Sequence, residues 1–398
     1  MHFVTLLAGL TLGQGPVDTP VPSVLTTPAP VEVGTASEAV PPGDRGRLMR
    51  LLDQTRAGAW MERERLTVSG WTDLSFTPST ASRNQLPMGF NYLANDFLLQ
   101  QNWLRIDRAT DPESGSPSFG YRFDTILPGS DYRFTKARGL WDGQTGRYGI
   151  DPVQFYGEAY LPGVGQGLSV KLGRFFAPYG VESIAAPDTP LASRAYTFIY
   201  NPFTQTGLLG TLKVNDRWSI KSGITTGNDV FIDPASSPYF VVGFVWSPDD
   251  GDTSIDFITI LGSGRFNTRE VFHNPQVFDV VLTRKLTERT TWKLDALYGF
   301  TNDVPGIGFA NWYGIVNYLI HDWTDQLATT GRLEFFDDCQ GQRTGTSGLY
   351  TAITAGLAYK PKPWLWLRPE VRLDHNKNRP FEGKPTLFTA GLDVLLRW

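Results

Sequence analysis

TTWKLDALYGF, residues 290–300, alternates between two kinds of side chain along its length. Its even positions from Trp292 onward carry Trp, Leu, Ala, Tyr and Phe, whereas Thr, Lys and Asp occupy odd positions. The final stretch TLFTAGLDVLLRW, residues 386–398, repeats the pattern and stops on an aromatic residue. Period-two alternation predicts β-strands with one apolar and one polar face. An aromatic residue at the end of the last strand is typical of bacterial outer-membrane barrels.

Similar segments recur from Leu66 to the end of the chain. We count about 16 candidate strands, an even number as closed bacterial barrels require. Short links such as 215–216 and 361–362 alternate with longer ones such as 178–204 and 375–385. The fold class that we predict is therefore all-β, a transmembrane antiparallel up-and-down barrel with short turns facing the periplasm and long loops facing outside.

The positions of the charged residues test this prediction. Arg or Lys facing lipid at the membrane midplane costs about 2–4 kcal/mol, so a membrane wall excludes charges from one parity. Arg105 and Arg108 break the rule within one expected strand, and a β-bulge is one explanation. A soluble barrel or sandwich with its apolar face inside is the alternative. The charges that obey the rule are Lys171, Lys213, Lys221, Asp256, Asp279, Lys293, Asp295, Arg332, Glu334, Arg368, Glu370, Arg372, Asp393 and Arg397.

The composition excludes other classes of protein. The sequence offers no run of about 20 apolar residues, as a helical membrane span requires. A net charge of −4 gives no basic excess, so we expect no nucleic-acid partner. Cys339 is the only cysteine, which excludes an intrachain disulfide and a cysteine-based metal cluster.

The N-terminal part of the chain differs from the rest. We interpret residues 1–15 as a signal peptide with an atypical n-region, a misassigned start being the alternative. Residues 16–44 form a Pro-rich disordered linker, and residues 45–65 a short amphipathic periplasmic helix that either docks on the barrel or is solvated. Residues 66–398 form the outer-membrane β-barrel.

Four segments carry a family resemblance. LGRFFAPYGVE (172–182) and NPFTQTG (201–207) resemble the signature of the OmpL-like β-barrel porin family of outer membranes. WLWLRPEVRLD (364–374) is similar to that family's penultimate strand, and GWTD (70–73) to its opening one. The resemblance covers residues 66–398 and implies an outer-membrane pore. It supplies no agreed functional residues.

In a porin, charges in the lumen and any loop folded inward determine passage. The longest loop, 176–205, is a candidate constriction and carries Glu182, Asp188 and Arg194. We hypothesise that this loop and a ladder of lumen charges set the field of the pore; a salt-bridge network that only stiffens the wall is an equal alternative. Because acids and bases nearly cancel, we expect weak ion selectivity. The wall candidates are Lys293, Asp295, Arg332, Glu334, Arg368, Glu370, Arg372, Asp393 and Arg397.

The sequence thus predicts a porin for passive diffusion of small hydrophilic solutes or ions, embedded in outer-membrane lipid, with a homotrimer left open. Two alternatives remain: a non-conducting structural or adhesive barrel, and an outer-membrane hydrolase. We expect no enzyme, cofactor or metal, because His2, His273, His321 and His375 are scattered without metal spacing. Residues 249–252 could bind Ca²⁺, but a hairpin turn explains them without an ion.

Overall fold

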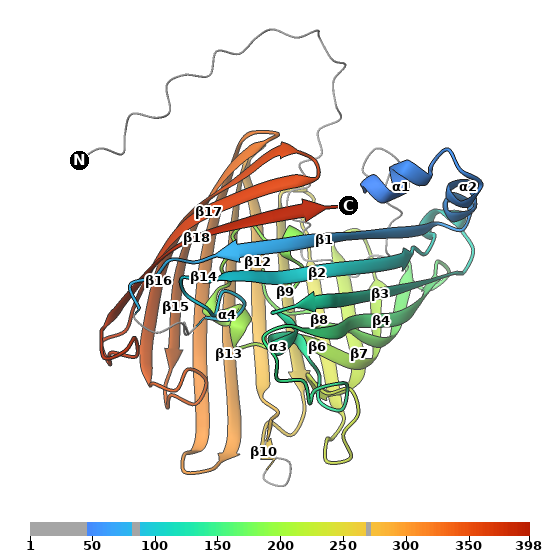
Figure 1. Cartoon of the computed structure of the whole chain (residues 1–398). Helices are drawn as coiled ribbons and strands as arrows, with labels where there is room; N and C mark the ends of the chain where they lie inside the picture. Colours follow the sequence, from blue (N-terminus) through green and yellow to red (C-terminus); the bar gives the residue numbers. More distant parts are fainter. Residues whose placement is uncertain (1–45, 82–87, 268–271) are drawn as a thin grey trace, which may run out of the picture.

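The computed structural model describes residues 46–81, 88–267 and 272–398. Within them, sixteen antiparallel strands close into one barrel, which confirms the predicted fold class (Figure 1). Each strand pairs with its barrel neighbours in chain order, and β1 pairs with β18 to close the ring. No helix in the described part is long and apolar enough to cross a membrane. The barrel strands are β1 Leu66–Phe76, β2 Phe97–Arg108, β3 Ser118–Gly129, β4 Gly149–Leu161, β5 Leu168–Phe176, β6 Thr204–Lys213, β7 Trp218–Asn228, β8 Tyr239–Trp246, β9 Thr253–Leu261, β12 Gln276–Thr287, β13 Thr290–Val304, β14 Gly308–Thr324, β15 Leu327–Asp338, β16 Gly348–Lys362, β17 Leu365–His375 and β18 Thr386–Arg397; β10 Phe266–Asn267 and β11 Phe272–His273 form a separate hairpin.

The two ends of the barrel differ in the length of their links. We call the end where β18 finishes the turn end, and the opposite end the loop end. Two links depart from the alternation expected from the sequence. The turn end includes the longer link 109–117, which contains the 3-10 helix η2 Pro112–Ser114, and the loop end includes the tight turn 305–307.

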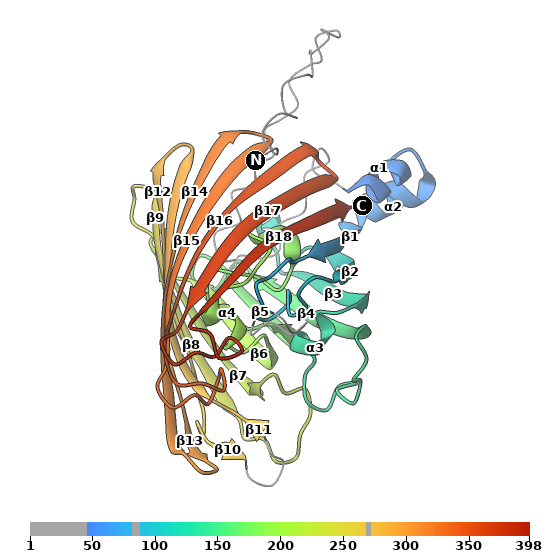
Figure 2. The same cartoon turned by 60° about the vertical axis from the view of Figure 1, so that its left-hand side comes forward.

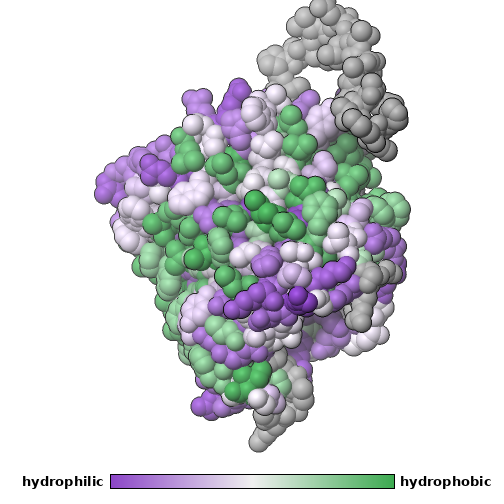
Figure 3. All heavy atoms as spheres, turned by 90° about the vertical axis from the view of Figure 1, so that its left-hand side faces the viewer, coloured by the Kyte–Doolittle hydropathy of each residue, from purple (hydrophilic) through white to green (hydrophobic). Residues whose placement is uncertain are grey.

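The outward face of the wall is apolar. Ile353 on β16 has 58% of its surface exposed and Leu319 on β14 has 51%, whereas the neighbouring residues of the other parity, such as Thr354 and Tyr318, point inward and are buried. Figure 3 shows hydrophobic side chains gathered across one side of the barrel. A soluble fold would bury this face, so the soluble alternative is wrong.

Arg105 and Arg108 differ in parity, but no bulge between them is needed to explain this. The register of β1 and β2 shifts at Gln100, which precedes both arginines. Arg105 points inward and pairs with Asp124 at 2.8 Å. Arg108 is the last residue of β2, at the turn end, where its guanidinium donates to the Phe119 carbonyl. A charge at the rim does not cross the lipid midplane, and so the parity rule does not apply there.

Two short helices lie at the turn end beside β1, α1 Arg47–Leu52 and α2 Arg56–Arg63, in place of the single expected helix (Figure 1). The Thr55 side chain caps α2 by accepting from the Gly58 amide at 3.0 Å. Arg47 lies 4.9 Å from the ring centre of Trp364, so α1 contacts the barrel rim. The expected signal peptide (1–15) and linker (16–44) lie outside the described residues.

Three links of the loop end fold into the barrel. The first is the β1–β2 link, where Phe90 is buried. The second is 130–148, which contains α3 Tyr132–Thr135. The third is residues 177–203, here called the inner loop, which contains η3 Ala186–Asp188 and α4 Tyr196–Ile199. Figure 2 shows α4 within the ring of strands. The Phe90 ring lies 5.6 Å from that of Phe198, so the first and third links pack together.

Candidate functional site

The inner loop is held by carboxylates on the lumen face of the wall. Glu370 on β17 accepts hydrogen bonds from the amides of Ala192 and Ser193 at 3.0 and 3.1 Å. Glu334 on β15 accepts from the Tyr196 amide at 2.9 Å. Hydrogen bonds to an ionised acceptor are shorter and about twice as strong as neutral ones. These acids therefore fix the loop backbone.

Arginines on the same wall bind the carbonyls of the inner loop. Arg368 on β17 donates to the carbonyls of Ala186 and Thr189 at 2.8 and 2.7 Å. Arg372, four residues further along the same strand, donates to the Arg194 carbonyl at 2.7 Å. Alternate residues of a strand share one face, which explains why this pair reaches the same loop.

Glu182 of the inner loop is bound on two sides. Its carboxylate lies 3.1 Å from Arg332 and also accepts from the Tyr318 hydroxyl and from the Ala195 amide. Arg332 in turn pairs with Glu334 at 2.7 Å. Removing one partner of such a buried network leaves an unpaired charge, which costs about 3–5 kcal/mol.

A glycine allows the loop to approach two acids. Gly180 has φ +70°, and its amide donates to Asp279 on β12 at 2.6 Å. The next amide, of Val181, donates to Asp295 on β13 at 3.4 Å, and Thr197 donates to the same carboxylate at 3.3 Å. A side chain would be strained at this φ and would place its Cβ 3.3 Å from Asp295 Oδ2.

We call the wall residues that hold the loop the loop seat: Asp279, Asp295, Arg332, Glu334, Arg368, Glu370 and Arg372. Each of them is at most 7% exposed. The expectation that they line an open lumen stays a prediction. Their contacts in the structure are with one another, with the inner loop and with wall residues such as Asp374 and Asp393, as expected for a network that stiffens the wall.

The other expected pore residues lie in different surroundings. Asp393 on β18 pairs with Arg368 at 2.5 Å, and Lys293 is 3% exposed. Arg194 lies inside the loop packing, 5.2 Å from the ring centre of Phe90. Asp188 is exposed on the inner loop, and Arg397 is exposed at the turn end. The structure therefore brings most of these residues to the inner loop, but not Arg397.

Sequence reasoning missed two members of this region. Asp279 has the same polar parity as the selected acids, and its position in the strand could have identified it. Gln101 on β2 gave no such signal. Its side chain donates to the Ile184 carbonyl at 2.7 Å and accepts from the Ala186 amide at 3.1 Å, so it holds the loop from a strand outside the loop seat.

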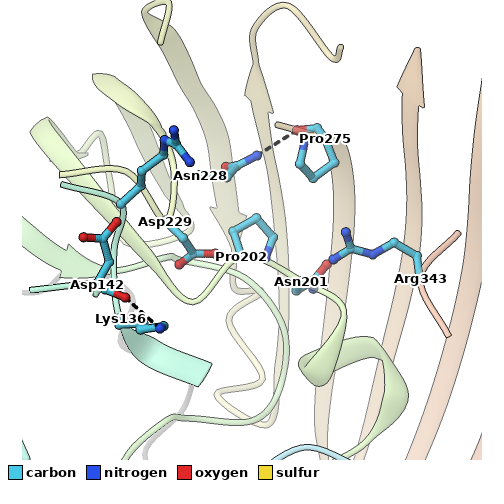
Figure 4. Close-up of a pocket in the computed structure, with 9 residues that line it drawn as sticks. Lys136, Asp142, Asn201, Pro202, Asn228, Asp229, Pro275 and Arg343 are labelled. Carbon is cyan, nitrogen blue, oxygen red and sulfur yellow. Dashed lines mark hydrogen bonds between the residues drawn. The ribbon is translucent and has the colours of Figure 1, made fainter. Parts of the chain in front are cut away.

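A cavity of about 390 Å³ lies at the loop end, and we call it the mouth pocket (Figure 4). Its lining comes from five links of the loop end, including the end of the inner loop, and from the last residue of β7. Burial raises the pKa of the Asp229 carboxyl to about 6 and lowers the pKa of the Arg343 guanidinium. The lining residues are Lys136, Arg138, Asp142, Asn201, Pro202, Asn228, Asp229, Pro275 and Arg343.

The described residues contain no cluster that could hold a metal ion. Asp250 accepts from the amides of Asp252 and Thr253 at 3.0 and 3.1 Å, and so it serves the hairpin turn. His321 hydrogen-bonds Thr290 at 2.9 Å, and no described serine side chain hydrogen-bonds His321 or His375. These two histidines therefore form no hydrogen-bonded Ser–His pair among the described residues.

Residues 65–396 match the family model described as "Putative beta-barrel porin-2, OmpL-like". The chain belongs to this family. It is an outer-membrane protein with a porin-like barrel. No match was found among curated proteins.

Solved outer-membrane structures share the fold at low sequence identity. The loop L8 deletion mutant of OmpT from Vibrio cholerae is 11% identical, with a TM-score of 0.54, and the match covers 84% of this chain and 99% of that one. The outer-membrane channel DcaP of Acinetobacter baumannii is 11% identical, with a TM-score of 0.52 and coverage of 84% and 97%. An anion-selective porin from Comamonas acidovorans is 11% identical, with a TM-score of 0.51 and coverage of 84% and 99%. These matches extend the likeness of fold along the whole barrel.

Proposed function

We propose that this protein is a porin that lets small hydrophilic solutes and ions diffuse passively across the outer membrane, without enzymatic activity. The observation that carries the proposal is the sixteen-strand wall with an apolar outside, a polar inside and a loop folded inward. Side chains fill an eight-stranded barrel, whereas barrels of 16–18 strands leave an aqueous channel. The inner loop would then act as the constriction.

Weak ion selectivity remains part of the proposal. Most wall charges pair with an opposite charge, as in Arg368–Asp393, Arg105–Asp124 and Lys221–Asp256. The fields of two paired charges largely cancel each other. At 0.1 M salt the remaining field is also screened beyond about 10 Å, so a passing ion meets little net field from these pairs.

A second candidate function is a non-conducting structural barrel. The observation that favours it is the burial of the loop seat together with the packing of Phe90 against the inner loop. Three inward links would then seal the lumen instead of narrowing it.

Single-channel recording separates the two candidates. The full chain, refolded in detergent and shown to be folded by its heat-dependent gel migration, is inserted in a planar bilayer. Stepwise and nearly ohmic openings with a small reversal potential under a salt gradient are expected. Silence from folded protein would favour the structural barrel, and a large reversal potential would contradict weak selectivity.

A further inference from the structure

We propose that the mouth pocket binds small hydroxylated carboxylates before they reach the inner loop. The passage of the solute rests on the proposed porin function, whereas the binding itself does not. The pocket lies at the loop end, and its lining spans the barrel from the link 130–148 to the link 339–347, which leave the wall at strands far apart in the ring. A solute that enters from the loop end meets this cavity.

Two cations face the pocket without an ion pair to any described residue. The Lys136 ammonium donates to the carbonyls of Asp142 and Gln144 at 2.8 and 3.0 Å. The Arg343 guanidinium donates to the Tyr200 carbonyl at 2.6 Å. Neutral carbonyls fix the direction of both groups but bring no opposite charge. Each cation has further N–H groups with which it could bind a carboxylate.

Two acids of the lining are already bound by backbone amides. Asp229 accepts from the amides of Phe203 and Thr204 at 3.0 and 2.8 Å, and Asp142 accepts from the Gly139 amide at 3.1 Å. These bonds hold the links in shape. Figure 4 shows Lys136, Asp142 and Asp229 on one side of the cavity and Arg343 on the other.

The formal charges around the pocket nearly balance, because Arg138 pairs with Asp233 and two acids face two unpaired cations. A bare inorganic anion would therefore gain little from net charge. A carboxylate that also carries hydroxyl groups fits better, since its hydroxyls can donate to acids and accept from cations and amides.

Asn201 supports this choice of ligand. It lines the pocket, is 5% exposed, and neither atom of its side-chain amide has a hydrogen-bond partner among the described residues. A buried polar group without a partner costs about 1–3 kcal/mol. A ligand hydroxyl that both donates and accepts would satisfy this amide.

Isothermal titration of the refolded full chain tests the proposal with gluconate as the probe. Sorbitol is the matched compound, because it has the same carbon chain with a hydroxyl in place of the carboxylate. We expect gluconate to bind at least about tenfold more tightly than sorbitol, a difference that corresponds to the carboxylate contacts. Equal binding of the two compounds, or no binding of gluconate at all, would overturn the proposal.

Two variants locate the binding. Lys136→Gln and Arg343→Gln each remove one cation from opposite sides of the pocket, and each is expected to weaken gluconate binding by about tenfold. Arg217→Gln is the control, because Arg217 pairs with Asp249 in exposed turns at the other end of the barrel. Unchanged binding in Lys136→Gln, which holds only two carbonyls, would contradict the proposal even if Arg343→Gln failed to fold.

Recording in a bilayer separates this inference from the porin function. If the protein binds gluconate but never conducts, the proposed binding site is supported and the proposed porin function is contradicted. If it conducts but does not bind gluconate, the porin function is supported and the binding site is contradicted.

Discussion

The loop seat and the mouth pocket are built from the same residue types, yet their charges are used differently. In the seat, Arg332 binds Glu182 and Glu334, and every charge contacts an opposite charge or the inner-loop backbone. In the pocket, Lys136 and Arg343 contact carbonyls and no carboxylate. A charge on the lumen side of a barrel holds a loop where its partners belong to that loop, and we propose that it binds a solute where it has no charged partner. Its partners decide which role it has.

The largest expected effect is in the seat. Arg332→Ala leaves Glu182 buried without its cation and Glu334 with Arg372 alone at 3.4 Å, and we expect it to lower the free energy of unfolding by about 3–5 kcal/mol. Equilibrium unfolding in urea with lipid vesicles measures this change. Arg217→Ala, an exposed ion pair at the turn end, should leave the transition in place. Equal transitions for both variants would show that the buried ion pairs of the seat stabilise the protein no more than an exposed pair does.

A pH dependence is expected at the edge of the seat. Burial raises the pKa of Asp131, in the link 130–148, to about 7, and its carboxyl accepts from Gln101 at 2.9 Å. A raised folded-state pKa gives stability that is present below the unfolded value near 4 and is lost as the pH rises through about 7. Between about pH 4 and pH 7, the free energy of unfolding of the wild type should fall by about 1.4 kcal/mol per pH unit relative to that of Asp131→Asn. Parallel pH profiles of the unfolding free energy would contradict this assignment.

The smallest effect on stability is expected in the pocket. Lys136→Gln removes two hydrogen bonds to carbonyls but no ion pair, so its free energy of unfolding should stay within about 0.5 kcal/mol of the wild type. The same urea experiment measures it. A loss as large as that of Arg332→Ala would show that Lys136 is structural and would make the pocket resemble the seat.

The architecture was predictable because it depends on a short-range pattern. Alternation in segments such as 290–300 assigns one face to lipid and one to the lumen, and the structure confirms the barrel and its number of strands. The tight turn 305–307 at the loop end was missed, because the sequence of a short link does not indicate on which end of the barrel the link lies.

The contacts of the site were less accessible to prediction. Parity placed Arg332 and Glu370 on the lumen side, but it could not show that the inner loop covers them. Gln101 carries no charge that would single it out on its strand and Asn201 lies in a loop, and their roles follow from segments distant in the chain. Loops lack the repeating geometry that relates a residue's position to its surroundings.

The seat also places a condition on the order of folding. Glu182 lies 150 residues before Arg332, and Ser193 lies 177 residues before Glu370. Contacts over such separations form late and slow the folding of a chain. The inner loop is made in the first half of synthesis, and its Ala192, Ser193 and Tyr196 amides lack their carboxylate partners until β15 and β17 have joined the wall. A barrel that stalls before its last strands insert would therefore carry an unseated loop, so closure of the wall and narrowing of the lumen are completed in the same step.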